Sequence, residues 1–356
     1  MAPPSGVSRA DDGAKIPTPV AFSSRDCLIE VDRTTDPMVP LQWMIPFEDN
    51  VLGVHEVPTS RRVQTFAFCR DPRPDEVLPN WINLEEAQGA VTRGELAALP
   101  APAEILESSS WATEPGHNGV AGDCVWPIQS PAQRTRLTCE ATAAGIAWDT
   151  AGVPEGPYVI RAYTYAPVNN LWSARAGVIR VGDTPAVARP PLAALLDPSR
   201  EAKLGADGPL SLRACLSDEA AAPISLEWAL TSSDLSDQAS WAPLTTQSMD
   251  FTGTGEVTFG PPPQATNQAI YVRASATSTA SGEPWWSYGA APILVANSFA
   301  TSTTEDGSPT FDHCDHDEPG LTGTATGGCS VQPGPTPALG LWLLLMSIGG
   351  RRQRRR

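Results

Sequence analysis

Two stretches decide the fold of this chain: YVIRAYTY at residues 158–165 and, after a Pro/Asn turn, WSARAGVIRV at residues 172–181. Both contain β-branched and aromatic residues at the density of strands, which predicts a β-hairpin. A similar pair recurs at residues 270–277 (IYVRASAT) and 285–295 (WWSYGAAPILV). Both pairs share a Tyr-Val start, an Arg-Ala step and a tryptophan opening the return strand, so we interpret them as a degenerate internal repeat.

The residues before the first hairpin favour the same kind of fold. Short strands are expected at residues 136–140 and 145–149, and the segment WDTAGVPEGPYVIRA occupies residues 148–162. This segment resembles the corner before a late strand in bacterial immunoglobulin-like and fibronectin-III-like domains. The resemblance implies a β-sandwich in which Tyr158 makes the tyrosine-corner hydrogen bond of such domains.

The residues before the second hairpin also predict strands. Residues 210–215 and 224–230 are expected to form paired core strands. Trp228 follows Cys215 by 13 residues, a spacing similar to that of the cysteine and tryptophan of an immunoglobulin core. No cysteine stands near Tyr271, where the second one would be expected, so we predict no disulfide between the two sheets here.

The N-terminal region predicts a third, more divergent module. Strands are expected at residues 27–32, 41–45 and 63–69, which bring cysteine, tryptophan and cysteine in the order of a sandwich core. Residues 84–107, with LEEAQ and RGELAAL, are the best candidate for a helix. Pro and Ala around residues 98–103 indicate a linker.

Together these patterns predict an all-β chain of two or three immunoglobulin-like β-sandwich modules in tandem, followed by a disordered stalk and a short C-terminal transmembrane helix. The expected order is a disordered N-terminus (1–22), a divergent β module (23–97), a β-sandwich module (98–183), a Pro/Ala-rich linker (184–199), a further β-sandwich module (200–297), a stalk with a sorting cysteine (298–332) and a transmembrane segment with an arginine cluster (333–356).

The tail combines GGCS at residues 327–330, an apolar run at residues 338–348 and five arginines within residues 351–356. A helix from Pro337 to Gly350 would be about 20 Å long, shorter than the roughly 30 Å hydrocarbon core of a bilayer. It would span only where the bilayer thins and the arginines snorkel to the headgroups. The arginines favour a cytoplasmic C-terminus, which places the body of the protein outside.

In this order, the cysteine, the apolar run and the arginines resemble the MYXO-CTERM sorting signal of myxobacterial surface proteins. The residues that carry the resemblance are Gly328, Cys329, Arg351, Arg352, Arg354, Arg355 and Arg356. It implies that Cys329 is the site of processing and lipid attachment, that an intramembrane sorting peptidase of the myxosortase type removes the tail, and that the product lies on the cell surface. The alternative is an ordinary C-terminal membrane anchor. Residues 1–20 lack the apolar segment of an export signal, so we expect the true start to lie upstream.

The charge of the chain excludes one class of partner. Its 24 basic and 40 acidic residues give a net charge of −16, and without the five tail arginines 19 basic residues remain, which gives −21. A body this acidic repels nucleic acid and anionic lipid. We therefore expect no nucleic acid partner, and a membrane partner only through the tail.

The cysteines indicate disulfides. Seven are present, and six remain if Cys329 is the sorting residue. An even number outside the cytoplasm is typical of a disulfide-bonded protein. Short separation along the sequence favours the pairs Cys27–Cys69 and Cys124–Cys139, and elimination leaves Cys215–Cys314. The alternative is that some of these are free buried thiols.

No pattern in the chain indicates an enzyme. The four histidines leave little to recruit for a catalytic triad, and no Gly-rich phosphate loop, zinc-helix motif or nucleophile elbow occurs. Residues 312–318 (DHCDHDE) are of metal-ligating types but lack the paired spacing of a structural zinc site, so we expect neither a metal nor a cofactor. A hydrolase with two converging carboxylates is the remaining enzymatic alternative.

Trp285, Trp286 and Tyr288 suggest a ligand platform. Side chains alternate along a strand, so one aromatic would point inward and others toward solvent, where they could receive sugar rings or an apolar partner. The plainer interpretation is that they fill the core and cover a sheet edge.

The sequence therefore predicts a non-enzymatic, exported, surface-anchored protein. Its β-sandwich modules would serve adhesion or contact with envelope, matrix, polysaccharide or surface proteins. The alternative is a surface carbohydrate-binding protein that uses the aromatic residues of the 200–297 module.

Overall fold

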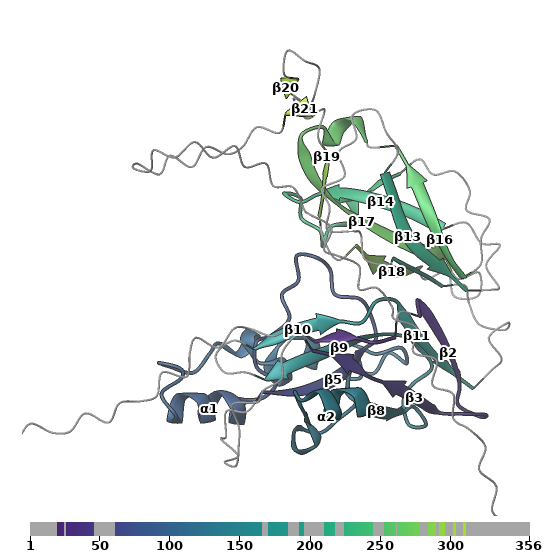
Figure 1. Cartoon of the computed structure of the whole chain (residues 1–356). Coiled ribbons are helices and arrows are strands. Elements are labelled where there is room, and N and C mark those ends of the chain that lie inside the picture. Colours follow the sequence, from purple (N-terminus) through teal and green to yellow (C-terminus); the bar gives the residue numbers. More distant parts are fainter. Residues whose placement is uncertain are drawn as a thin grey trace, which may run out of the picture. The chain divides into compact units, whose positions relative to one another are not determined.

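The computed structural model of the chain (Figure 1) describes residues 20–24, 26–45, 61–165, 170–183, 192–195, 210–217, 224–244, 253–260, 262–277, 284–289, 292–295, 302–303 and 309–310. The chain divides into two units, residues 1–300 and 301–356. Strands make up most of the regular structure of the described residues and helices are few. At this level the all-β prediction is confirmed.

The first unit begins with a β module, here called the first module (residues 20–183), whose centre is a seven-stranded sheet. Its main path runs β2–β11–β9–β5–β6, with β10 beside β9 and β7 beside β5. Strand β2 is parallel to β11, and the other pairs are antiparallel. The strands are β2 (Leu28–Asp32), β5 (Arg62–Phe68), β6 (Val125–Pro127), β7 (Thr135–Arg136), β9 (Gly156–Tyr165), β10 (Leu171–Ala174) and β11 (Val178–Gly182).

Two small ribbons accompany this sheet. One pairs β1 (Ala21–Phe22) with β4 (Trp43–Met44), and the other pairs β3 (Met38–Leu41) with β8 (Ile146–Asp149). Ala21 and Phe22 therefore belong to a strand, which corrects the end of the disordered N-terminus expected over residues 1–22. Residues 1–19 lie outside the described residues.

The predicted module boundary between residues 97 and 98 is wrong, because strands from both sides of it share one sheet. β5 pairs with β9 over its whole length, from Arg62 opposite Tyr165 to Phe68 opposite Val159. β2 likewise pairs with β11 over five residues. Residues 23–97 and 98–183 therefore build one module rather than two in tandem.

The helix predicted over residues 84–107 forms only in its first part, as α1 (Leu84–Thr92). The side chain of Asn83 caps it by accepting a hydrogen bond from the Glu86 amide (2.9 Å), and Glu85 and Glu86 complement the positive end of the helix dipole. Short 3₁₀ turns follow at Pro102–Glu104, Leu106–Ser108 and Ser110–Ala112. The first of them replaces the linker expected around residues 98–103.

A second helix, α2 (Cys139–Ala144), occupies part of the strand predicted at residues 136–140. The hydroxyl of Thr138 accepts a hydrogen bond from the Ala141 amide (3.2 Å), and an alanine-rich segment follows this cap. A cap and strong helix formers outweigh the strand pattern here. The strand predicted at residues 145–149 is confirmed as β8.

The first predicted hairpin is confirmed, because β10 runs antiparallel to β9 with Trp172 opposite Tyr163. The return strand then breaks, and β11 pairs with the start of β9, where Ile179 lies opposite Tyr158. Gly177 makes the break possible. It has a φ of 77°, and an added Cβ there would overlap the backbone of Cys27.

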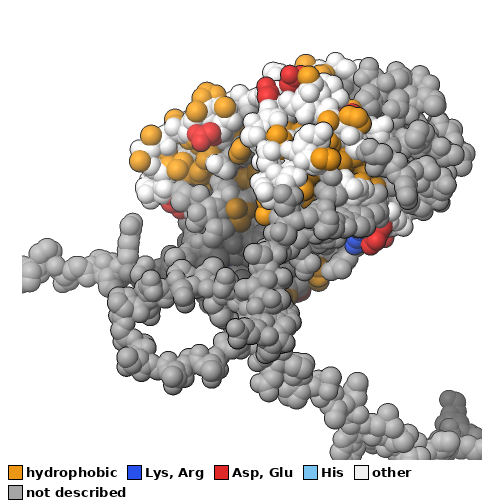
Figure 2. Space-filling model, turned by 90° about the horizontal axis from the view of Figure 1, so that it is seen from above, with side chains coloured by type: hydrophobic (Ala, Val, Ile, Leu, Met, Phe, Trp, Pro, Cys, Tyr) orange, Lys and Arg blue, Asp and Glu red, His pale blue; other side chains and the backbone are white. Residues whose placement is uncertain are grey.

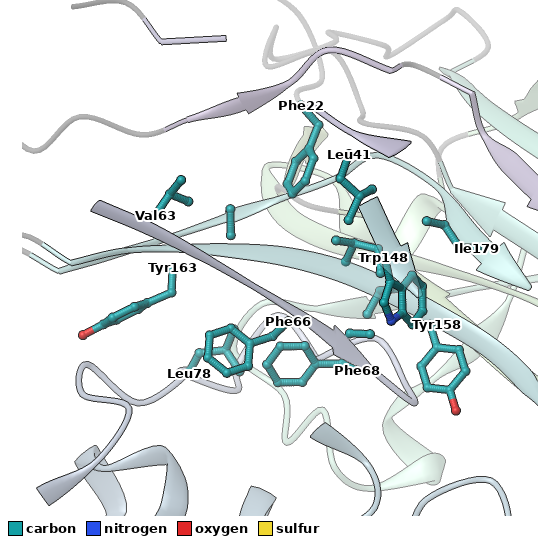
Figure 3. Packing of buried hydrophobic residues seen from close by; sticks show 14 of the residues in the cluster. Phe22, Leu41, Val63, Phe66, Phe68, Leu78, Trp148, Tyr158, Tyr163 and Ile179 are labelled. Atoms are coloured by element: carbon teal, nitrogen blue, oxygen red, sulfur yellow. The ribbon is translucent and has the colours of Figure 1, made fainter. Parts of the chain in front are cut away.

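The sheet of the first module is buried on both faces. Val159 and Ile160 of β9 are adjacent and point to opposite faces, and they are only 6% and 1% exposed. Figure 3 shows Val63 and Phe22 on one side of β5 and Phe68 on the other. Burial on both faces explains why residues 158–165 form a continuous apolar and aromatic run rather than a simple alternation.

The first unit also contains a second β module (residues 192–295) made of two sheets. The smaller sheet has the order β12–β13–β16. The larger has the order β15–β14–β17–β18, with β19 beside β17. The strands are β12 (Ala193–Leu195), β13 (Leu210–Leu216), β14 (Ile224–Leu230), β15 (Ala242–Pro243), β16 (Gly253–Phe259), β17 (Gln268–Thr277), β18 (Pro284–Tyr288) and β19 (Ile293–Val295).

The two sheets of the second module enclose one core and so form a β-sandwich. Leu212 and Phe259 come from the smaller sheet, and Leu226 and Ile270 from the larger. The predicted strands at 210–215 and 224–230 exist as β13 and β14, but they belong to opposite sheets, so the predicted pairing between them is wrong. The second predicted hairpin is confirmed by the β17–β18 pair.

The segments around the second module also differ from expectation. Strand β12 pairs with β13 inside the stretch predicted as a linker, residues 184–199. Within the predicted stalk, β20 (Ser302–Thr303) pairs with β21 (Pro309–Thr310) in the second unit. The predicted transmembrane segment, residues 333–356, lies outside the described residues.

Two disulfides link Cys27 with Cys215 and Cys69 with Cys124, so the three predicted pairs are wrong. Sheet neighbours, rather than short sequence separation, set the second bond. Cys69 follows β5 and Cys124 precedes the adjacent β6, and the Cys69 amide donates to the Cys124 carbonyl (2.8 Å). The other cysteines are Cys139, exposed at the start of α2, and Cys314 and Cys329, both outside the described residues.

Candidate functional site

One depression in the first module gathers polar side chains. Its volume is about 450 Å³, and its walls are Arg33, His117, Asn118 and the loop of residues 151–155. Arg33 follows strand β2, and the loop connects β8 with β9. The site therefore lies where two strands end and one begins, which is a usual place for binding residues held on a rigid scaffold.

The loop owes its shape to local hydrogen bonds. The Thr150 amide (3.0 Å) and hydroxyl (2.8 Å) both donate to the Pro37 carbonyl, and the Val153 amide donates to the Thr150 carbonyl (3.0 Å). The buried Tyr158 then donates its hydroxyl to the Pro154 carbonyl (2.8 Å). This is the corner hydrogen bond that the sequence predicted for Tyr158.

Arg33 is held tightly on one wall of the depression. Its guanidinium makes two hydrogen bonds of 2.6 Å to the two carboxylate oxygens of Asp183, and it also donates to the Val153 carbonyl. A longer contact of 3.5 Å reaches Glu155. With two carboxylates around it, Arg33 brings no net positive charge to the site, so it serves to position the loop rather than to attract an anion.

His117 forms another part of the wall. Its Nε2 lies 2.7 Å from the Pro157 carbonyl, which can only accept, so Nε2 carries the proton. The residue is exposed as a whole, but its ring packs edge-on against Tyr158, with 4.8 Å between ring centres. Desolvation of the ring lowers the pKa of His117, and the hydrogen bond to Pro157 offsets this only in part. The imidazole is therefore neutral near pH 7 and can accept a hydrogen bond through Nδ1.

The lining of the depression offers His117 no nucleophile to activate. Among the residues that line the depression none is a serine, threonine or cysteine, so His117 has no hydroxyl or thiol beside it there to activate. Sequence reasoning missed the site. The corner segment at residues 148–162 pointed to the loop, but nothing local indicated that Arg33 and His117 would meet it.

The predicted aromatic platform lies on β18 and is half-buried at all three positions. Trp285 packs against the large buried cluster that is centred on the first module, with its ring centre 6.3 Å from that of His117. Tyr288 packs on Trp241 at 5.7 Å between ring centres. The three residues therefore belong to packed layers rather than to an exposed row.

The third aromatic, Trp286, has an arginine on its face. The guanidinium carbon of Arg273 lies 3.8 Å from the Trp286 ring centre and 4.2 Å from that of Trp241. Arg273 also donates to Glu227 (2.8 Å) and to Gln238 (2.6 Å). This stack occupies one face of the Trp286 ring, a face that a sugar could otherwise use, which weakens the carbohydrate-platform hypothesis.

The remaining predicted site residues lie beyond the described part of the chain. They are Gly328, Cys329, Arg351, Arg352, Arg354, Arg355 and Arg356. The stretch at residues 312–318 lies there too. Among the described residues, no three His, Cys, Asp or Glu side chains gather in a metal-binding group, and none of the helices is long and apolar enough to cross a membrane.

Comparison with known proteins identifies no family. No family model and no curated protein matches the sequence. Among solved structures, the chain is similar to a chimeric titin Z1Z2–Z1Z2 tandem functionalized with an exogenous GRGDS peptide from fibronectin, with 12% identity, a TM-score of 0.20 and coverage of 78% of this chain and 99% of that one. It is also similar to the four N-terminal immunoglobulin domains of Dscam1 isoform 7.44, with 10% identity, a TM-score of 0.18 and coverage of 78% of this chain and 51% of that one.

Proposed function

We propose that this protein is an exported, non-enzymatic surface protein that displays its two β modules for adhesion or for contact with envelope or matrix components. The observation that carries the proposal is the pair of disulfides, Cys27–Cys215 and Cys69–Cys124. Disulfides persist in oxidising compartments and are rare in the cytoplasm. They therefore support a position outside the cytoplasm, which is where a display protein works.

The tail supports the same proposal from a separate direction. Cysteine, spacer, apolar run and arginines stand in the order of a sorting signal, and the arginines favour a cytoplasmic end. In this proposal Cys329 is processed and carries the anchor, and the body remains on the outside. The membrane and the sorting peptidase are the partners of the tail.

The described surface of the body mixes exposed apolar and acidic side chains. Figure 2 shows hydrophobic side chains at several places on one face, with acidic side chains between them. Met38, Met44 and Val77 are among the exposed large hydrophobic residues of the first module. Scattered apolar positions on an acidic body favour other proteins or neutral polymers as partners over anionic ones.

The sorting step is testable in a myxobacterial host. A version of the full chain tagged inside the body is compared with its Cys329→Ala variant, and surface exposure is measured by protease treatment of intact cells. Mass spectrometry of the recovered protein shows whether residues 330–356 have been removed. We expect the unaltered chain to be exposed and to lack its tail, and the variant to keep the tail.

Cys139→Ala is the matched control, because Cys139 is exposed on the body and has no part in the proposed signal. It should behave like the unaltered chain. Tail removal and surface exposure in the Cys329→Ala variant would exclude the sorting role of Cys329. A body that is never accessible to protease in any version would exclude surface display altogether.

A further inference from the structure

The Cys27–Cys215 disulfide joins the two β modules. Cys27 stands directly before β2 of the first module, and Cys215 lies on β13 of the second, 188 residues later. Both are buried, with 4% and 2% of their surface exposed. A covalent bond thus links the two modules in addition to the chain and to their non-covalent contacts.

The backbone around Cys27 is built to hold it in place. The Cys27 carbonyl accepts a hydrogen bond from the Val178 amide (2.8 Å), and Gly177 leaves room for this approach. The buried Arg175 donates to the carbonyl of the preceding residue, Asp26 (2.6 Å). Cys27 is therefore presented by the break between β10 and β11 rather than by a loose terminal segment.

Apart from the disulfide, a small number of described non-covalent contacts join the two modules. The Tyr288 amide of β18 donates to Asp71 (3.1 Å), which also pairs with Arg161 of β9 (3.0 Å). Burial raises the pKa of Asp71 against the opposing pull of Arg161, so this contact carries a desolvation cost. Trp285 and the buried Leu192 add apolar contact with the cluster centred on the first module.

Each module has a core that does not depend on the junction. The second module closes its two sheets over Leu226, Ile270 and Phe259, and the first module buries both faces of its own sheet. Interfaces between modules of one chain allow relative motion unless they are large and apolar. Without the bond, the junction would depend on the contacts of Tyr288, Trp285 and Leu192.

We propose that Cys27–Cys215 is an oxidation-dependent clamp: the two modules are folded but free to separate while these thiols are reduced, and become one rigid body when the bond forms. The proposal rests on export to an oxidising compartment, as proposed above. The two thiols exchange with an external disulfide, which takes up the two electrons and two protons as two thiols. The chain would then cross the membrane with separable modules and lock them afterwards.

The clamp is tested by hydrogen exchange with mass spectrometry on the full chain in detergent. In the Cys27→Ala/Cys215→Ala variant we expect the Tyr288 amide to exchange at least about tenfold faster than in the oxidised unaltered chain, because opening of the junction releases it from Asp71. Amides of β9 and β17 should keep their protection. Reduction of the Cys69→Ala/Cys124→Ala variant, in which Cys27–Cys215 is the remaining described disulfide, should give the same local change relative to its own oxidised form, and reoxidation should reverse it.

The matched control is Cys69→Ala/Cys124→Ala, which removes a disulfide within the first module. In this variant the exchange rate of the Tyr288 amide should not increase more than the exchange rates of the β9 amides. Unchanged exchange at Tyr288 in the clamp variant would overturn the proposal. Loss of protection throughout β9 and β17 would also overturn it, since the bond would then hold the modules folded rather than together. Thiol alkylation in intact cells tests the proposed export separately from the clamp. If Cys27 and Cys215 are found reduced in cells, export is contradicted, whereas the behaviour of the disulfide in the purified protein is unaffected.

Discussion

The long central strands of the two modules, β9 and β17, are paired in the same register but lie in different surroundings. In the first module Arg161 lies opposite Ala174 and Tyr163 opposite Trp172. In the second, Arg273 lies opposite Tyr288 and Ser275 opposite Trp286. Arg161 thus corresponds to Arg273, and Trp172 to Trp286. In both copies the return strand breaks and a second short strand, β11 or β19, pairs with the start of the long one.

The modules differ in the segments that pack against β9 and β17. Residues 69–124 of the first module form helix α1 and a set of turns, and the backbone carbonyls of Asn80 and Pro79 in this segment accept hydrogen bonds from Tyr163 and Trp172. Arg161 accordingly pairs with Asp71 in that segment. In the second module the equivalent Arg273 stacks between two tryptophans. A repeated strand pattern therefore specifies pairing and register, and the inserted segments specify the packing around it.

The largest expected difference between the modules comes from the Cys69–Cys124 bond, which closes 55 residues within the first module. Removing it with Cys69→Ala/Cys124→Ala should lower the stability of the first module by about 4 kcal/mol, because the unfolded chain gains freedom. Urea titration read by hydrogen exchange at β9 and β17 measures the two modules separately. An equal loss at β17 would show that they unfold together.

The arginine stack should be the strongest side-chain element of the second module. Arg273→Met leaves Glu227 without its partner and removes the cation from two indole rings, at an expected cost of about 3 kcal/mol. Arg213→Met is the matched control, since Arg213 is exposed on β13, and should change stability by less than about 0.5 kcal/mol. Similar values for the two variants in urea unfolding would contradict the role of the stack.

Tyr158 of β9 and the buried Ile270 of β17 occupy equivalent positions in the two modules. Only the tyrosine can make the corner bond to Pro154. Tyr158→Phe should therefore cost the first module about 1 kcal/mol. Tyr271→Phe is the control in β17 and should have almost no effect on the midpoint of urea unfolding. A neutral Tyr158→Phe would mean that the corner bond contributes nothing to stability.

The smallest expected effect is the pH-dependent contribution of the Arg70–Glu76 ion pair to the stability of the first module. Burial alone would raise the pKa of Glu76, but two hydrogen bonds of 2.8 Å from Arg70 and its charge lower it overall. Because the folded-state pKa lies below that of the unfolded chain, Glu76 stabilises the fold above the unfolded pKa and loses this contribution as the pH falls. Glu76→Gln should cost about 1 kcal/mol at pH 7 and nothing once the carboxyl is protonated.

Unfolding of the Glu76→Gln variant and of the unaltered chain is compared between pH 3 and pH 7 to check this. The control Glu85→Gln alters an exposed carboxylate at the start of α1 and should show little of this convergence. A constant difference between Glu76→Gln and the unaltered chain over the whole range would exclude the ion pair as its cause.

The sequence predicted the elements whose signal is local. The two hairpins, the N-terminal part of α1 and the corner bond of Tyr158 each depend on residues close together in the chain. The disulfides and the module boundary could not be found in this way, because β5 pairs with β9 across residues 69–155. The depression around Arg33 and His117 has the same origin. Its walls meet only after strands far apart in sequence have paired.

The parallel pairing of β2 with β11 makes the first module slow to complete. Glu30 and Arg180 lie opposite each other although they are 150 residues apart. Closing so long a loop is entropically costly, and folds dominated by such non-local pairs form slowly. Because the chain is synthesised from its N-terminus, β2 is exposed long before β11 has been made. Until β11 arrives, the backbone groups of β2 that β11 will bind have no partner in this sheet and are open to pairing with another chain.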